Sequence, residues 1–160
     1  MGKILSRHDL QTEIDALHRQ GKKIVFTNGC FDILHVGHVR YLREAKKKGD
    51  ALVLALNSDR SVQAIKGDKR PIVPEAERAD VMAALEAVDY VTIFEELTPL
   101  ALIETLKPDV LIKGGDWEEE KIVGRDAVLS WGGQVAVIPE IKGASTTNIV
   151  EKIRTVYGGD

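Results

Sequence analysis

The chain has 160 residues, with 22 Lys and Arg against 25 Asp and Glu, a net charge of −3, and 44% hydrophobic residues. This composition is typical of one soluble domain with a single core, and the slightly acidic balance argues against a protein that binds nucleic acid through a broad basic surface. No apolar run approaches the roughly 18 residues that a membrane span needs, and a single cysteine cannot form an internal disulfide, so we expect a cytoplasmic protein that binds no membrane.

The first predicted element is an amphipathic helix near the N-terminus. Apolar residues recur at helical spacing from Leu10 to Leu17, and Gly21 is a plausible stop. Ser6, with an acidic residue three positions later, is typical of a helix N-cap. The first six residues also match an N-myristoylation pattern, but so short a pattern often matches by chance and a capping role already accounts for Ser6.

Beyond this helix, apolar segments alternate with helical patterns. Strands are predicted at 22–27, 51–56, 90–94, 110–112 and 134–138, and helices at 36–48, 59–65, 75–85, 98–106, 124–131 and 146–156. Because these strands are apolar throughout, we expect a sheet that is covered on both faces.

The sequence therefore predicts an α/β fold: a single Rossmann-like domain with a five-stranded parallel sheet and helices on both faces. It would span residues 1–160, as an N-terminal helix at 1–21 and a catalytic core at 22–157. In such sheets, ligands bind beyond the carboxyl ends of the strands.

The densest motif, GCFDILHVGH, leads from the first of these strands into a helix. Gly29 and Gly37 allow the backbone to approach a ligand closely, and a helix start offers free N–H groups to an anion. His35 and His38 are three residues apart, so they share one helix face and can both donate hydrogen bonds to one phosphate. The alternatives are a surface coincidence or a metal pair, for which neighbouring ligands to complete a zinc set are lacking.

A second phosphate-suited motif precedes the last helix. Ser145, Thr146 and Thr147 can cap free N–H groups and, together with them, hold phosphate oxygens. A plain helix cap is the alternative. The functional interpretation gains weight because this helix start is expected at the same edge of the sheet as the histidine motif.

A charged loop and a glycine pair complete the candidates. Lys66, Lys69, Arg70 and Arg78 suit a mobile group of cations around a polyphosphate, although each alone fits a solvated loop equally well. The two glycines of the segment 113–117 suggest backbone packed against a flat ligand such as a base, with a simple turn as the alternative. Asn57 and Asp59 could hold sugar hydroxyls or cap the following helix.

These motifs resemble a known family. GCFDILHVGH is similar to the Gly-x-Phe-Asp-x-x-His-x-Gly-His signature of the nucleotidyltransferase superfamily that contains the cytidylyltransferases and phosphopantetheine adenylyltransferase. The likeness continues through LNSD, KGDKRPIVPEAER, ALEAVDYV, LIKGGDW and GASTTNIV, and is closest to the adenylyltransferase domains of ADP-heptose synthases. Ala144 replaces the family's isoleucine before Ser-Thr-Thr, and Glu140 and Lys142 stand where cytidylyltransferases usually place an arginine, which argues against cytidylyl transfer.

This resemblance implies transfer of AMP from ATP to D-glycero-β-D-manno-heptose 1-phosphate, giving ADP-heptose and pyrophosphate for lipopolysaccharide core or related glycans. Mg²⁺ is expected with ATP, a homo-oligomer, most simply a dimer, is expected as the assembly, and the sugar kinase of the pathway is expected on a separate chain. The expected catalytic residues are His35, His38 and Lys66; the nucleotide-binding residues are Asn28, Gly29, Cys30, Phe31, Gly37, His38, Lys113, Gly114, Asp116, Ser145, Thr146 and Thr147; the acceptor-binding residues are Asp32, Asn57, Asp59 and Arg78, with Asp32 also the candidate Mg²⁺ ligand.

Three alternatives stay open at this point. The acceptor could be glycerol 3-phosphate, phosphoethanolamine or FMN, with ATP or CTP as donor. The chain could be a non-catalytic nucleotide-binding module, although the full set of histidines, lysine and hydroxyls disfavours this. The likeness of His-Val-Gly-His to the His-Ile-Gly-His of class I aminoacyl-tRNA synthetases suggests a fragment of such an enzyme, but no basic excess or tRNA-binding domain supports it.

Overall fold

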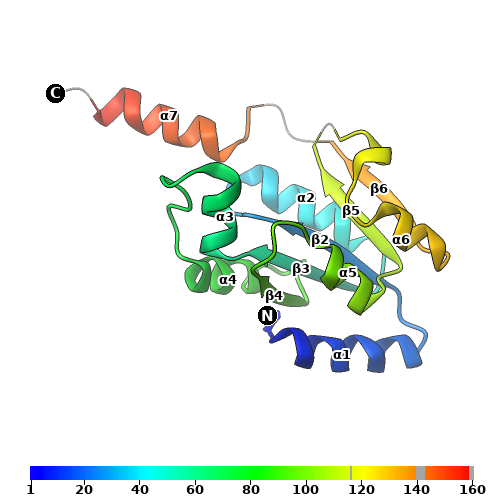
Figure 1. The fold of residues 1–160 in the computed structure, drawn as a ribbon. Coiled ribbons are helices and arrows are strands. Elements are labelled where there is room, and N and C mark those ends of the chain that lie inside the picture. Colours follow the sequence, from blue (N-terminus) through cyan, green and yellow to red (C-terminus); the bar gives the residue numbers. More distant parts are fainter. Residues whose placement is uncertain (116, 140–142, 159–160) are drawn as a thin grey trace.

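The computed structural model describes residues 1–115, 117–139 and 143–158, and its described strands form one parallel sheet in the order β1-β4-β3-β2-β5-β6 (Figure 1). The strands are β1 (Lys3–Ile4), β2 (Ile24–Gly29), β3 (Ala51–Asn57), β4 (Tyr90–Phe94), β5 (Val110–Gly114) and β6 (Gln134–Ile138). The helices are α1 (Arg7–Arg19), α2 (Val36–Lys46), α3 (Asp59–Lys66), α4 (Glu75–Ala83), α5 (Leu100–Leu106), α6 (Arg125–Ser130) and α7 (Thr146–Tyr157), with a 3-10 turn η1 (Glu119–Lys121).

The predicted number of strands was wrong by one, because six strands form the sheet in the described part of the chain. The additional strand is β1, in which Lys3 lies beside Tyr90 and Ile4 beside Val91. Both β1 residues are exposed, and two residues are too few to form an apolar pattern, so the sequence does not indicate this strand. The pairing depends on backbone hydrogen bonds at the sheet edge, such as Leu5 N–H to the Val91 carbonyl at 2.9 Å.

The sheet is covered on both faces, as the apolar strands predicted. Ile24 and Phe26 of β2 pack in one core cluster with α1, α5 and α6, whereas Val25 packs on the opposite face with α2 and α4. This division follows from the alternation of side chains along a strand. The predicted cap of α1 is confirmed, since Ser6 Oγ accepts a hydrogen bond from Asp9 N at 3.1 Å.

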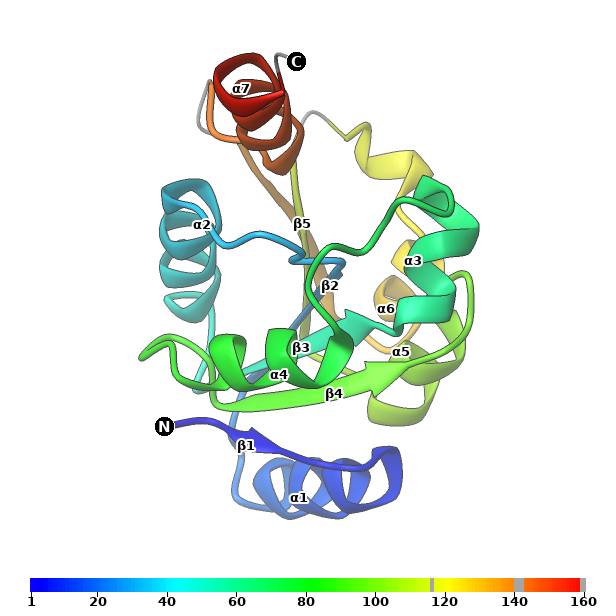
Figure 2. The same ribbon diagram turned by 90° about the vertical axis from the view of Figure 1, so that its left-hand side faces the viewer.

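The strand order reverses direction at β2, which places a crevice at the carboxyl edge of the sheet. From β2 the chain adds β3 and β4 on one side, then returns to add β5 and β6 on the other. Such a reversal is where open α/β sheets bind ligands. The start of α2, the end of α3 and the start of α7 line the cavity at this edge. Figure 2 shows α2 and α3 on opposite sides of the molecule, with α7 above them.

The remainder of α7 extends away from the sheet, and none of its residues is buried (Figure 1). Within the described parts of the chain, no helix has the length and apolar character required to cross a membrane.

Candidate active site

A cavity of about 1430 Å³ opens at the carboxyl edge of the sheet. It brings together most of the residues singled out from the sequence: Asn28, Gly29, Cys30, Phe31, Asp32, His35, Gly37, His38, Asn57, Lys66, Lys113, Gly114, Ser145, Thr146 and Thr147. Two of the expected acceptor-binding residues, Asp59 and Arg78, are not among its lining residues. Asp116, Glu140 and Lys142 lie outside the described residues.

The glycines of the GCFDILHVGH segment, residues 29–38, which we call the signature loop, make room for neighbouring rings of the protein itself. A Cβ atom on Gly29 would lie 2.8 Å from the Phe31 ring, and one on Gly37 would lie 2.9 Å from the His35 ring. Phe31 has a φ of 44°, which only a minority of non-glycine residues adopt. The loop is therefore folded back tightly, and this close packing positions the two histidine rings.

The histidines stack on each other at the start of α2. Their ring centroids are 3.8 Å apart with an interplanar angle of 24°, and the Phe31 ring lies 5.0 Å from that of His38. His35 occupies the N-cap position with an extended backbone, so both rings sit beside the free N–H groups of the helix start. The Nδ1 atom of His38 is buried and forms no hydrogen bond with the described residues. This arrangement suits an anion that approaches the helix start.

Burial fixes the charge state of His38. Desolvation, and secondarily the neighbouring His35, lowers the pKa of His38 from 6.5 to about 4. The ring is therefore neutral at pH 7, so it can give a phosphate oxygen a hydrogen bond but not a full positive charge.

Acidification from pH 7 to pH 5 is expected to destabilise the wild-type protein more than the His38→Gln variant. Above pH 6.5, His38 is neutral in both the folded and the unfolded chain; between pH 6.5 and about pH 4 only the unfolded chain takes up the proton, so stability falls as the pH falls. Glutamine does not titrate. Urea unfolding midpoints at pH 7 and pH 5 measure the difference, and equal losses in the two proteins would contradict the buried, neutral ring.

Two lysines line the cavity from different elements, Lys113 on β5 and Lys66 on α3. Lys113 Nζ donates a hydrogen bond to Asn28 Oδ1 at 3.1 Å and lies 5.7 Å from the centroid of the Trp117 ring. Burial lowers the pKa of Lys113. Lys66, by contrast, is the exposed last residue of α3. The cavity thus has a half-buried cation fixed on the sheet and an exposed cation at a helix end.

The start of α7 is held against the signature loop. Thr146 Oγ1 donates a hydrogen bond to the Ile33 carbonyl at 3.3 Å, and Ser145 Oγ accepts one from Asn148 N at 3.0 Å. Ser145 is therefore a helix cap, and its role in phosphate binding stays a prediction. Because Ser145 uses its oxygen as the cap acceptor, its hydroxyl proton is left to donate to a ligand oxygen. Two helix starts thus face one cavity.

Asp32 does not fit the role of a metal ligand. Its side chain is fully buried, and its carboxylate oxygens accept hydrogen bonds from Arg70 Nε and from the backbone N–H groups of Ile72 and Val73. Burial alone would raise the pKa of Asp32, but these hydrogen bonds outweigh it and lower the pKa. In the described parts of the chain, no group of three or more His, Cys, Asp or Glu side chains is placed to hold a metal ion.

Arg78 and Asp59 are bonded to each other, and neither lines the cavity. Arg78 is 1% exposed, and its Nη2 atom donates to Asp59 Oδ1 at 2.7 Å. The structure therefore does not place either side chain where an acceptor in the cavity would touch it. Asn57 does line the cavity, with its amide donating to Ser61 Oγ at 2.9 Å.

Sequence reasoning missed several lining residues, among them Arg40, Tyr41, Leu97, Thr98 and Trp117. The Tyr41 hydroxyl is hydrogen-bonded with Thr27 and with the Ile112 carbonyl, and burial raises the pKa of Tyr41 to about 12. A Cβ atom on Gly114 would lie 3.0 Å from the Tyr41 ring. The glycine, which was noted as room for a flat ligand, thus also makes room for Tyr41. Trp117 could have been predicted, because it ends the LIKGGDW segment that follows β5.

Comparison with known proteins identifies relatives of this chain. The chain is 59% identical to the bifunctional protein HldE of Geobacter metallireducens over 98% of its length, and 54% identical to that of Syntrophotalea carbinolica over 97%. It spans about a third of the length of these curated relatives, 32% in both cases.

Among solved structures, a lipopolysaccharide core biosynthesis protein from Thermoplasma volcanium is 31% identical, with a TM-score of 0.62, and the match covers 78% of this chain and all of that one. A macrolide-efflux protein from Streptococcus pneumoniae, 19% identical with a TM-score of 0.65, shares the fold over 96% of this chain and 58% of its own. The sequence model of the family described as Cytidylyltransferase-like matches residues 26–152, which include the histidine motif and the Ser-Thr-Thr motif. The chain therefore belongs to the cytidylyltransferase-like family.

Proposed function

We propose that this chain transfers AMP from ATP to D-glycero-β-D-manno-heptose 1-phosphate, releasing pyrophosphate and forming ADP-heptose. The observation that carries the proposal is the stacked pair of His35 and His38 at one helix start, with a second helix start and Lys66 lining the same cavity. The 59% identity to a bifunctional HldE and the likeness to a lipopolysaccharide core biosynthesis protein favour the heptose acceptor.

The reaction needs no basic residue to create its nucleophile. A phosphate monoester has a second pKa of about 6, so the acceptor phosphate is already largely a dianion near neutral pH. One of its oxygens attacks the α-phosphorus of ATP, a new P–O bond forms, and the bond to the β-phosphate breaks as pyrophosphate leaves. The protein has to align two anions and stabilise the charge that builds up on the leaving group.

The cavity supplies donors for that charge. The N–H groups at the starts of α2 and α7, the neutral ring of His38 and the hydroxyl of Ser145 are hydrogen-bond donors, and Lys66 adds a full positive charge. Because the hydrogen bond from Thr146 to the Ile33 carbonyl joins the start of α7 to the loop before α2, the donors at these two helix starts need little reorganisation when the nucleotide binds.

Mg²⁺ belongs to the proposal as part of the nucleotide substrate. It neutralises charge on the triphosphate, and its usual ligands are substrate phosphates with one or two carboxylates. Asp32 has no free oxygen for it, since Arg70 and the 72–73 backbone occupy the carboxylate. We therefore assign metal binding to the phosphates and not to this residue. A homodimer and a cytoplasmic location complete the proposal.

Pyrophosphate release is expected only with ATP and a heptose 1-phosphate when ATP and CTP are crossed with heptose 1-phosphates, glycerol 3-phosphate, phosphoethanolamine and FMN in the presence of Mg²⁺. A coupled pyrophosphate assay on the purified full chain measures this. Release with another pair would retain the transfer chemistry and reject the acceptor. If the protein binds ATP but releases nothing with any acceptor, the catalytic proposal is wrong and a nucleotide-binding module is the better account.

A further inference from the structure

Two buried charged side chains join three separate segments around the cavity. Segment 67–74, which links α3 to α4, lies against the signature loop. Asp32, on that loop, has a fully buried side chain whose Oδ1 accepts hydrogen bonds from the N–H groups of Ile72 and Val73, both at 2.9 Å. Its Oδ2 atom accepts one from Arg70 Nε. A single carboxylate thus fixes the second half of segment 67–74.

Arg78 fixes the same segment from the other side. From α4, its Nε atom donates to the Val73 carbonyl at 2.9 Å, its Nη1 atom to the Cys30 carbonyl at 2.6 Å, and its Nη2 atom to Asp59 Oδ1 at 2.7 Å. The N–H of Val73 is therefore held by Asp32, and its C=O by Arg78. Removing either buried charged side chain is costly, because the groups that were hydrogen-bonded to it are left unpaired.

These contacts hold the start of α3 directly and its end through the segment that follows it. Its first residue, Asp59, is bonded to Arg78, and its last residue, Lys66, is followed by the segment that Asp32 fixes. The helix itself buries only Ser61 and Val62, and Ser61 Oγ adds a hydrogen bond to the Glu96 carbonyl at 3.0 Å near the start of the helix. The position of Lys66 thus depends on contacts made by residues that lie outside α3.

We propose that Asp32 and Arg78 are positioning residues that tether segment 67–74 and both ends of α3 to the signature loop, and thereby hold Lys66 over the phosphate site. The inference rests on the proposed function, because it gives the tether a part in phosphate transfer. It also accounts for residues that had been expected to bind the acceptor or Mg²⁺: their polar atoms are used within the protein, and their effect on the reaction passes through Lys66.

A double-mutant cycle tests the route through Lys66. Asp32→Asn and Arg78→Lys are each expected to lower kcat on the order of ten-fold, with a smaller change in KM for ATP, because a cation displaced by about 1 Å stabilises the leaving group poorly. In a Lys66→Met background, the same changes are expected to cost less than about two-fold. Equal losses in both backgrounds would show that the two residues act independently of Lys66 and would overturn the proposal.

Matched controls exist for both substitutions. Asp68→Asn makes the same chemical change at an exposed position of the same segment, and Arg60→Lys does so on the exposed surface of α3. Both are expected to keep kcat within about two-fold of wild type, as surface substitutions usually do. Thermal unfolding identifies any variant that fails to fold. Asp32→Asn and Arg78→Lys each form a separate double-mutant cycle with Lys66→Met, so one cycle remains if the other variant does not fold.

Hydrogen exchange tests whether Asp32 holds segment 67–74, and it needs no measurement of enzyme activity. In Asp32→Asn, the amides of segment 70–74 are expected to exchange faster than in wild type, because Ile72 and Val73 lose a charged acceptor; in Lys66→Met and Asp68→Asn they are expected to be unchanged. Unchanged exchange in Asp32→Asn would overturn the tether whatever the kinetics. A wild-type protein that binds ATP but releases no pyrophosphate would contradict the proposed function alone, and exchange would then decide the tether.

Discussion

Replacement of His38 with alanine is expected to lower kcat for pyrophosphate release by about 100-fold or more while the chain stays folded. The neutral ring is a donor at the helix start, and its loss removes a hydrogen bond that strengthens as charge builds up on the leaving pyrophosphate. His35→Ala is expected to act similarly, because the rings stack at 3.8 Å and each limits the other's orientation. Initial rates of pyrophosphate release and thermal unfolding curves measure the two effects separately.

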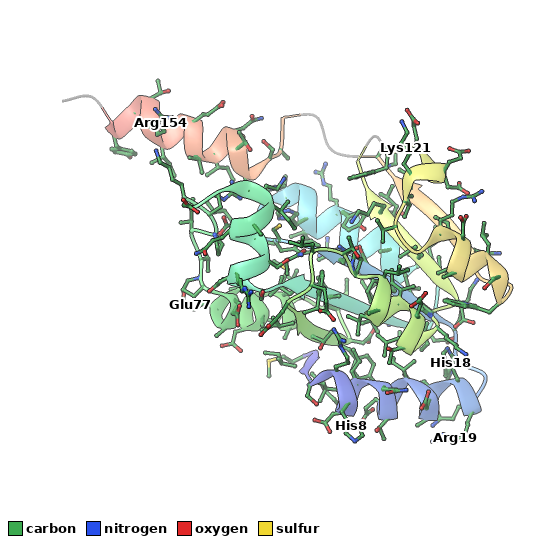
Figure 3. The ribbon with its side chains drawn as sticks, in the orientation of Figure 1. His8, His18, Arg19, Glu77, Lys121 and Arg154 are labelled. Carbon is green, nitrogen blue, oxygen red and sulfur yellow. The ribbon has the colours of Figure 1, made fainter. Side chains whose placement is uncertain are left out.

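The matched control is His8→Ala on α1. Figure 3 shows His8 on the far side of the molecule from α7, and its side chain is exposed. We expect this variant to match wild type in rate and stability. Full activity in both His35→Ala and His38→Ala would remove the principal support for the proposed function. Inactive variants that are also unfolded would assign the histidines a structural part, because the loop packs around them.

Most of the fold could be predicted because the core is encoded in local patterns. The strands in the middle of the sheet are continuous apolar runs, as burial on both faces requires, and β3 is buried at every residue from Ala51 to Asn57. The edge strand β1 could not be predicted in this way. Its two residues are exposed and are held by backbone hydrogen bonds to β4, and backbone pairing leaves no trace in side-chain pattern.

The candidate site was predictable in its location and only partly in its roles. Motifs at the ends of β2 and β5 and at the start of α7 were expected to meet at one edge, and they line one cavity. The partners of polar side chains were not predictable. Asp32 and Arg78 look like ligand-binding residues in sequence, yet they bond to segments about 40 or more positions away, Val73 and Cys30. Such spacing carries no local signal, so only the folded chain distinguishes a free carboxylate from one already occupied.

Replacement of Lys66 with methionine is expected to lower kcat by about 100-fold, with a smaller change in the Kd for ATP. Lys66 is exposed at the end of α3 and lines the cavity, so the substitution removes a charge without opening a hole in the core. A cation that contacts the leaving pyrophosphate stabilises the transition state more than the bound nucleotide, and the loss therefore falls on kcat. Single-turnover rates and ATP titrations measure the two quantities.

Lys48→Met is the control, since Lys48 is an exposed lysine that is not among the cavity-lining residues. It loses the same charge and is expected to retain the wild-type rate. If Lys66→Met weakens ATP binding but keeps the wild-type rate at saturation, Lys66 stabilises bound ATP and not the pyrophosphate that leaves in the transition state. That result would also remove the reason for fixing α3 so firmly, because an exposed lysine that only attracts ATP needs no exact position. A fall in kcat is therefore what links the Arg70–Asp32 and Arg78–Asp59 ion pairs to the chemistry at the α-phosphorus.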